Sequence, residues 1–189
     1  MKVNMDKAQP FATRRSWRAW LRKNHNKEQE LWLIYYKKHT GKPTVSYNDS
    51  VEEALCFGWI DSTVRTIDEK RFAQRFSPRK PNSKYSPANK ERLKFLLKKK
   101  KVIKEVRESL GAIAQEKFII PEDILAEIKS NKQAWKHFQK FSEPYKRIRV
   151  GFIDGARKRP TEFKKRLAYF IKMTEQNKQF GFGGIEKHY

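Results

Sequence analysis

The sequence lacks the features that mark secreted, metal-binding and membrane-spanning proteins. Cys56 is the only cysteine, so no disulfide can form within the chain, which is typical of a reducing compartment. The four histidines are scattered and show no metal-ligand spacing. The longest apolar run, residues 54–60, is far shorter than the ~20 residues that span a bilayer, and residues 1–11 contain no apolar signal-peptide segment. We therefore expect a cytoplasmic protein without a membrane span, a metal or a cofactor.

The sequence also lacks the common catalytic and nucleotide-binding motifs. It contains no Gly-x-x-x-x-Gly-Lys-(Ser/Thr) phosphate loop, no Gly-x-Gly-x-x-Gly, no Gly-x-Ser-x-Gly and no His-Glu-x-x-His. No motif therefore predicts a catalytic residue. Cys56 stands among apolar neighbours, where a thiol is usually a small buried hydrophobe, because a nucleophilic thiol needs an adjacent base.

Acidic residues are few relative to basic ones. The chain has 44 Lys and Arg but only 21 Asp and Glu, which gives a formal net charge of +23. Such a surface attracts polyanions through long-range steering and counterion release. The expected partner is an anionic ligand or an acidic macromolecule, and nucleic acid is one candidate. The other interpretation is a lysine-rich surface that only aids solubility, since the excess is spread along the whole chain.

The first half of the chain predicts a small sheet packed with helices. Ser46 is a good helix N-cap and Gly58 a good helix stop, with an apolar face between them. A run that is apolar on both faces predicts a central strand, and two alternating β-branched runs after it predict a hairpin. The predicted elements are helices over 13–25 and 46–57 and strands over 31–36, 62–67 and 71–76.

From Ser86 onward the apolar residues follow the helical period in segment after segment. We therefore predict the α+β class, with a small antiparallel sheet of about three strands packed with N-terminal helices, followed by an all-helical C-terminal half. The predicted domains are an α+β domain over residues 1–87, a helical region over residues 88–179 and a Gly/aromatic tail over residues 180–189. The tail either docks its rings on a neighbouring element or stays flexible.

Residues 59–89 combine the end of an apolar helix with a polar loop, and they hold the predicted ligand site. Asp61 follows the helix end and needs a partner if it is buried; the nearby arginines are Arg65, Arg71, Arg75 and Arg79. Arginine forks, neutral donors and aromatic walls suit an anionic ligand with an aromatic or sugar part. The alternative is that Asp61 pairs with an arginine and the others cap helices and turns. The predicted ligand-binding residues are Trp59, Asp61, Arg75, Ser77, Arg79, Ser83, Tyr85, Ser86 and Asn89.

Two stretches of this region carry a family resemblance. ALCFGWID (residues 54–61) and RFSPRKPNSKYSPAN (residues 75–89) resemble a block in the YdeI/OmpD-associated family of bacterial proteins, a bacteriocin-protection family. Family members end the block in Ser-x-(Trp/aromatic)-Ser-x-x-Asn, and Tyr85 stands where Trp is more usual. The resemblance covers most of the chain and weakens after Leu97. It implies a link to envelope-stress protection and to an outer-membrane porin, and it implies no reaction and no catalytic residue.

Three functions fit these observations. The first is a binding protein for an anionic partner or ligand, which the resemblance accommodates most easily. The second is a nucleic-acid-binding protein that uses a basic helical face, for which the alternative is a solvated surface. The third is a small enzyme in which Asp61 acts as acid or base and Arg75 or Arg79 holds an anion. The predicted basic face consists of Arg147, Arg149, Arg157, Lys158 and Arg159.

Overall fold

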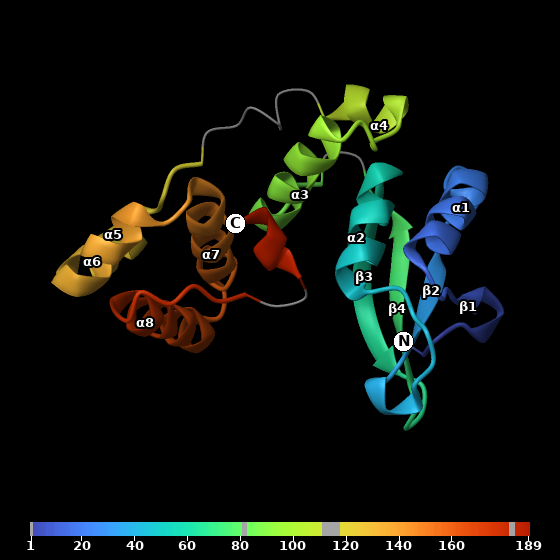
Figure 1. The fold of residues 1–189 in the computed structure, drawn as a ribbon, viewed down its shortest axis with the longest axis horizontal. Helices are drawn as coiled ribbons and strands as arrows, with labels where there is room; N and C mark the ends of the chain where they lie inside the picture. Colours follow the sequence, from blue (N-terminus) through green and yellow to red (C-terminus); the bar gives the residue numbers. More distant parts are fainter. Residues whose placement is uncertain (1, 81–82, 111–117, 182–183) are drawn as a thin grey trace. The chain divides into compact units, whose positions relative to one another are not determined.

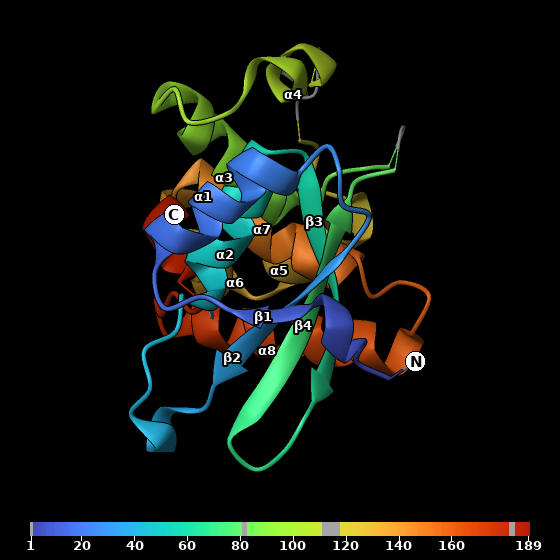
Figure 2. The ribbon, with the colours of Figure 1, turned by 90° about the vertical axis from the view of Figure 1, so that its right-hand side faces the viewer.

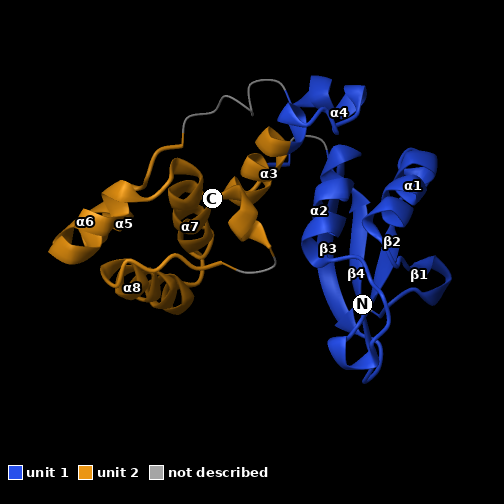
Figure 3. Ribbon diagram, viewed as in Figure 1, with its two compact units in different colours: residues 1–84, 96–111 blue, residues 85–95, 112–189 orange. Residues whose placement is uncertain are grey.

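The protein consists of two compact units, which are described one at a time. The computed structural model describes residues 2–80, 83–110, 118–181 and 184–189. Unit 1 comprises residues 1–84 and 96–111, and unit 2 comprises residues 85–95 and 112–189 (Figure 3). The sequence predicted a domain boundary after residue 87. The two units are grouped differently, because residues 96–111 belong to unit 1. The backbone N–H of Ile103, for example, donates to the carbonyl of Cys56 at 3.1 Å.

Unit 1 contains a four-stranded sheet in the order β1-β2-β4-β3. The strands are β1 (Ala8–Pro10), β2 (Leu31–Tyr36), β3 (Trp59–Thr66) and β4 (Arg71–Pro78). β4 pairs antiparallel with both β2 and β3, whereas β1 pairs parallel with β2. The predicted α+β class, the central strand and the hairpin are confirmed. The sheet is mixed rather than purely antiparallel, because the additional strand β1 pairs parallel with β2. β1 was not predicted, since it is too short to give an alternating pattern in the sequence.

Both faces of β2 are buried, as its apolar sequence predicts. Trp32 and Ile34 pack with Ala73 on one face. The other face is covered by α1 (Arg14–Asn24) and α2 (Tyr47–Cys56) (Figures 1 and 2). Trp17 of α1 contacts Phe76 of β4, with ring centroids 5.4 Å apart, and its indole N–H donates to a carbonyl of α2 at 3.0 Å. This indole therefore fixes both helices to the same face of the sheet.

The ends of the two helices follow from their capping residues. The hydroxyl of Thr13 accepts from the backbone N–H of Ser16, and that of Ser46 accepts from the N–H of Asp49, each at 3.1 Å. α2 ends at Cys56, and Gly58, two residues further on, has a φ of +73° that suits a residue without a side chain. The remaining short elements of unit 1 are the 3-10 helices at Met5–Lys7 and Lys38–Thr40 and the helix α4 (Lys104–Ser109).

Unit 2 is helical, as predicted. Its elements are the first part of α3 (Pro87–Lys98), then α5 (Glu122–Ser130), α6 (Lys132–Lys140), α7 (Glu143–Asp154), α8 (Pro160–Glu175) and a 3-10 helix at Ile185–His188. Ile124, Ile128, Phe138, Tyr145 and Phe170 form the centre of its core. The predicted helical period places these residues on the inner faces of α5 to α8.

Phe180 and Tyr189 of the Gly/aromatic tail dock their rings on unit 2, as one of the two interpretations expected, and residues 182–183 lie outside the described residues. Phe180 packs against Tyr169 at 5.1 Å, and Tyr189 packs edge-to-face on Tyr145 at 4.7 Å. The hydroxyl of Tyr189 also donates to the carbonyl of Phe180 at 2.8 Å. The tail therefore closes the core of unit 2.

Gly151 lets α7 approach the start of α3 within unit 2. A Cβ placed on Gly151 would lie 2.2 Å from Cγ of Pro87, closer than two carbon atoms can approach. The ring of Pro87 is rigid, so it cannot rotate away as a flexible side chain would.

We expect Gly151→Ala to lower the free energy of unfolding by about 1–3 kcal/mol, the usual cost of overpacking. Gly155→Ala is the matched control in the same region, since its Cβ would come no closer than 3.3 Å to any atom, and we expect a change within about 0.5 kcal/mol. Urea unfolding followed by circular dichroism measures both. Equal midpoints for the two variants would contradict the close contact.

Candidate functional site

The structure separates the predicted site residues that lie on the hairpin. Asp61 of β3 is paired with Phe76 of β4, so both point to the face that α1 and α2 cover. Side chains alternate along a strand, and Arg75 and Ser77 therefore point to the opposite face. The enzyme hypothesis combines Asp61 with Arg75 or Arg79, and the sheet directs Arg75 away from Asp61.

Trp59 and Asp61 both have partners within unit 1. Trp59 is 1% exposed, packs edge-to-face on Trp20 and donates from its indole N–H to the carbonyl of His25 at 2.9 Å. Asp61 accepts from the hydroxyl of Tyr47 at 3.1 Å and from the amide of Gln74 at 2.6 Å. Asp61 is thus held by neutral donors, whereas the alternative interpretation paired it with an arginine. Trp59 belongs to the core and offers no wall to a ligand.

The two predicted arginines bind groups of their own unit. Arg75 forms an ion pair with Glu30 at 2.5 Å. Nη2 of Arg79 donates to the carbonyls of Ser83 and Lys84 and to the hydroxyl of Ser83, at 2.9, 3.1 and 3.0 Å. Arg79 therefore orders its own loop.

The last three predicted residues, Tyr85, Ser86 and Asn89, belong to unit 2. The hydroxyl of Ser86 caps α3 by accepting from the N–H of Asn89 at 3.2 Å, and the side-chain oxygen of Asn89 accepts from Arg92 at 3.0 Å. Tyr85 precedes this cap and is half-buried. Arg79, Ser83 and Ser86 thus have turn and cap contacts of the kind that the alternative interpretation described.

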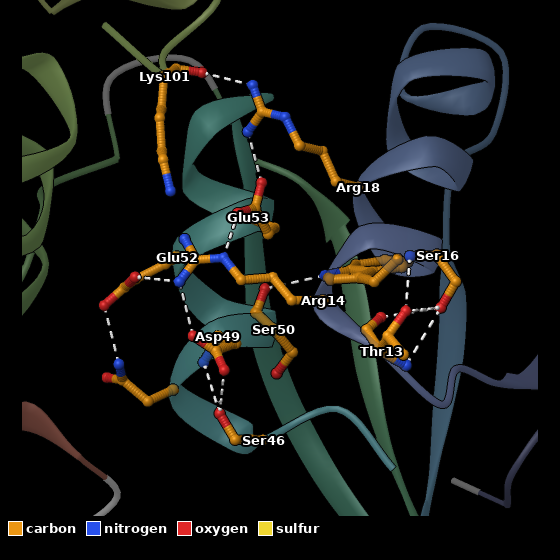
Figure 4. A network of polar contacts seen from close by, with 12 residues as sticks. Thr13, Arg14, Ser16, Arg18, Ser46, Asp49, Ser50, Glu52, Glu53 and Lys101 are labelled. Atoms are coloured by element: carbon orange, nitrogen blue, oxygen red, sulfur yellow. Dashed lines mark hydrogen bonds and ion pairs between the residues drawn. The ribbon is translucent and has the colours of Figure 1, made fainter. Parts of the chain in front are cut away.

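A network of ion pairs between α1 and α2 is the dominant polar feature of unit 1 (Figure 4). Arg14 contacts three carboxylates of α2: Asp49 at 2.6 Å, Glu52 at 3.0 Å and Glu53 at 2.5 Å. Arg18, one helical turn further along α1, contacts the other oxygen of Glu53 at 2.5 Å. Its Nη2 also donates to the carbonyl of Lys101 at 2.9 Å, which holds residues 98–101 against α1.

Two of the three carboxylates of this network are deeply buried. Glu52 and Glu53 are 0% and 1% exposed. Burial alone would lower the pKa of Arg14 and of Arg18, but the hydrogen bond and the negative charge of Glu53 outweigh it, so that both pKa values are raised. Both arginines therefore stay charged, and both are already paired. The network therefore holds helices together and is not arranged to exchange protons with a substrate.

Cys56 is a small buried hydrophobe, as predicted. It is 0% exposed, and burial together with the nearby charge of Glu53 raises the pKa of its thiol to about 11. The thiol is therefore protonated at neutral pH, whereas a nucleophile must be a thiolate.

The outer side of α1 forms a basic surface together with the turn that follows α3. Arg15, Arg22 and Lys23 are exposed, and within the described part of unit 1 they form no ion pair with a carboxylate. Residues 98–101 are four successive lysines. We define the basic surface as Arg15, Arg22, Lys23 and residues 98–101. This basic surface was not predicted. The sequence did indicate it, because residues 14–24 contain basic residues and no Asp or Glu.

Lys100 has a left-handed backbone at the end of α3, with φ of +53°. The N–H of Lys101 donates to the carbonyl of Leu96 at 3.0 Å and that of Lys100 to Leu97 at 2.9 Å, which is the usual closing pattern of a helix that ends in glycine. The left-handed backbone conformation of a lysine is about 1–2 kcal/mol less favourable than the right-handed conformation. The turn therefore retains four lysines in spite of local strain.

The predicted basic face of unit 2 is largely committed to internal contacts. Arg147 pairs with Glu91 at 2.8 Å, and Arg157 pairs with Asp123 at 2.8 Å. Arg149 is 2% exposed and stacks 4.4 Å from the ring centre of Phe180. Only the neighbouring Lys158 and Arg159 are exposed members without a described ion pair.

The described residues contain neither a membrane-spanning helix nor a cluster of metal ligands. In residues 2–80, 83–110, 118–181 and 184–189, no helix combines the length and the apolar character that crossing a bilayer requires. In the same residues, no three His, Cys, Asp or Glu side chains are grouped as metal ligands would be.

Two family models match the chain. Residues 9–109 match a domain of unknown function, DUF8412, and residues 117–177 match OmdA, described as "Bacteriocin-protection, YdeI or OmpD-Associated". The second match confirms the predicted family for that part of the chain. Residues 54–89, which suggested it, lie within the first match, so the resemblance does not extend over most of the chain and does not weaken after Leu97 as predicted. No curated protein and no solved structure matches significantly.

We expect Glu53→Gln to lower the free energy of unfolding by about 3–5 kcal/mol, because it leaves Arg18 without its carboxylate partner and removes one of the three carboxylates that Arg14 contacts. Asp68→Asn is the matched control: it removes a carboxylate that pairs with Arg71 at 2.7 Å at the surface, where a pair contributes less than about 1 kcal/mol. Thermal unfolding of both variants tests the difference. Similar losses would show that the α1–α2 network does not support unit 1.

Proposed function

We propose that this chain, which belongs to the DUF8412 family, is a non-catalytic binding protein that engages an anionic macromolecule through the basic surface of unit 1. One observation carries the proposal: α1 has basic residues on two sides, and carboxylates neutralise only one of them. Arg14 and Arg18 face the acids of α2. Arg15, Arg22 and Lys23 face solvent.

The spacing of the cations supports one continuous binding surface. Arg15 and Arg22 lie two helical turns apart on the outer side of α1, and Arg18 lies between that side and the side of Arg14. Because Arg18 also binds the carbonyl of Lys101, the lysine turn continues this side. Flexible lysines bind phosphate or carboxylate groups as point charges, which suits a polymer better than a single rigid ligand.

Binding is favoured over catalysis by the positions of the candidate acid and its partners. Asp61 is engaged by Tyr47 and Gln74, and Arg75 lies on the other face of the sheet. A polyanion needs no such alignment, since counterion release supplies the affinity. We include a cytoplasmic location in the proposal, and a nucleic acid is the first polyanion to test.

We expect the wild-type chain to bind a fluorescein-labelled DNA duplex of about 20 base pairs with an affinity that falls steeply with salt. Replacing Arg15, Arg22 and Lys23 by Gln should make the slope of log K against log[salt] about 2.7 units shallower, about 0.9 for each lost phosphate contact. Anisotropy titrations between about 50 and 200 mM salt measure the slope. Single-stranded DNA and polyglutamate as competitors distinguish a nucleic acid from an acidic protein.

The matched control replaces Lys164, Lys165 and Lys172 by Gln. These lysines are exposed on α8 of unit 2, and the change in net charge is the same. We expect this control to keep the wild-type slope within about one unit. Equal losses in both variants would assign the binding to net charge alone, and absence of binding of any polyanion at ~150 mM salt, where the Debye length is about 8 Å, would overturn the proposal.

We also propose that the chain takes part in bacteriocin protection, which is what the description of the matched OmdA family names. Bacteria that produce the wild-type chain should survive a bacteriocin challenge better than cells with an empty vector. The Gln variant of Arg15, Arg22 and Lys23 should lose most of this benefit, and the α8 control should keep it. Equal survival with and without the chain would rule out the protective role, and full protection by the first variant would separate it from anion binding.

A further inference from the structure

Unit 2 contains a pocket of about 280 Å³ that the proposed function does not use. Lys90, Glu91 and Lys94 of α3 line it, and Arg147 of α7 lines it from another helix. Positions 87, 90, 91 and 94 lie on one side of α3, because their spacing matches the helical repeat. Three cations and one carboxylate thus meet around a small space within one unit.

Glu91 fixes two of these cations. Arg147 approaches it with both arms of its guanidinium, at 2.8 and 3.2 Å, and Nζ of Lys94 lies 3.1 Å from the same carboxylate. Burial alone would raise the pKa of Glu91, but the hydrogen bonds from Arg147 and Lys94 outweigh it and keep this pKa below its usual value. Glu91 therefore stays charged and orients its partners, as carboxylates behind a binding site commonly do.

The charges at the pocket do not cancel. Lys94 and Arg147 contribute two positive charges and Glu91 one negative charge, which leaves a surplus of +1 without counting Lys90. Arg and Lys each carry more N–H donors than Glu91 engages. The surplus charge and the remaining donors are suited to a ligand that brings its own negative charge.

Other residues that line the pocket are apolar. Phe118 and Ile119 line it, and Ile119 is 82% exposed, the highest value for a large apolar side chain among the described residues. A ring placed against Ile119 would remove this surface from water, which stabilises a complex by about 25 cal/mol per Å². A lining that combines apolar side chains with a few charged groups is the usual composition of a site for small organic ligands.

We infer that this pocket binds a small organic anion that carries an aromatic ring, with the anionic group on the α3–α7 cations and the ring on Phe118 and Ile119. Its volume is close to the lower end of the range for small-molecule pockets, about 300–1,000 Å³, so a monophosphate or carboxylate with one or two fused rings is the fitting size. This site is independent of the basic surface of unit 1, because all of its residues belong to unit 2.

Three probes separate the two halves of the ligand. 1-Naphthyl phosphate carries ring and anion, inorganic phosphate only the anion, and 1-naphthol only the ring. We expect isothermal titration calorimetry on the full chain to give an affinity for 1-naphthyl phosphate at least tenfold higher than for either of the others. Binding of inorganic phosphate with equal affinity, or of none of the three probes, would overturn the inference.

Two mild substitutions test the location without disturbing the Glu91 contacts. Lys90→Gln removes one positive charge, and Ile119→Ser removes the exposed part of the apolar wall. We expect each substitution to lower the affinity for 1-naphthyl phosphate at least fivefold. Lys136→Gln on the exposed side of α6 should leave this affinity unchanged. Circular dichroism melts verify that all three variants fold. Unchanged affinity in both pocket variants would place the probe elsewhere and refute the site.

The same preparations keep this inference distinct from the proposed function. The pocket variants should bind the DNA duplex with the wild-type affinity. The Gln variant of Arg15, Arg22 and Lys23 should bind 1-naphthyl phosphate with the wild-type affinity. Loss of both ligands in the Lys90→Gln variant would show that a single electrostatic surface binds both, and it would refute a separate pocket.

Discussion

The contact of Glu53 with Arg14 and Arg18 is the interaction on which unit 1 depends. Each oxygen of this buried carboxylate binds a different guanidinium of α1, so one side chain of α2 sets the distance between two helices. Charges in such a place are costly to bury, and they persist because each has a partner of opposite sign within hydrogen-bond reach. The consequences extend outward. Arg18 also holds the lysine turn, and because the inner arginines are fixed, the outer basic residues of α1 are directed to solvent.

Arginine and lysine are used differently in this protein, and the difference explains how a chain with a net charge of +23 folds. Arginine supplies the cation in the most buried ion pairs, such as Arg14 with Glu53 and Arg147 with Glu91. Its planar, weakly hydrated fork matches a carboxylate and tolerates burial better than an ammonium group. Lysine instead occupies exposed positions such as residues 98–101. The acids are therefore consumed mainly inside the units, and the uncompensated charge lies at the surface, where water and salt screen its self-repulsion.

Local signals in the sequence were sufficient for most of the fold, and long-range pairings were not. Ser46 and Gly58 delimited α2 because capping depends on neighbouring residues alone, and the hairpin followed from alternation. The strand β1 was missed because three residues carry no period. The predicted ligand site did not take strand alternation into account: Asp61 and Arg75 lie close in the hairpin register and yet point to opposite faces. The partners of the buried carboxylates were beyond prediction, since Arg147 and Glu91 are 56 residues apart and only the packing of α7 on α3 brings them together.

Two buried glutamates, one in each unit, have the same architecture and opposite consequences. Glu53 and Glu91 each bind two cations, and in each case a guanidinium comes from another helix. Around Glu53 there are also Asp49 and Glu52, so three carboxylates face two arginines and the cluster has no positive charge left for a ligand. Around Glu91 a single carboxylate faces two cations, Lys94 and Arg147, and the remaining positive charge lies at a pocket. The same device, a buried carboxylate that orients basic side chains, therefore stabilises one unit and prepares the other for an anion, and the ratio of acids to bases decides which.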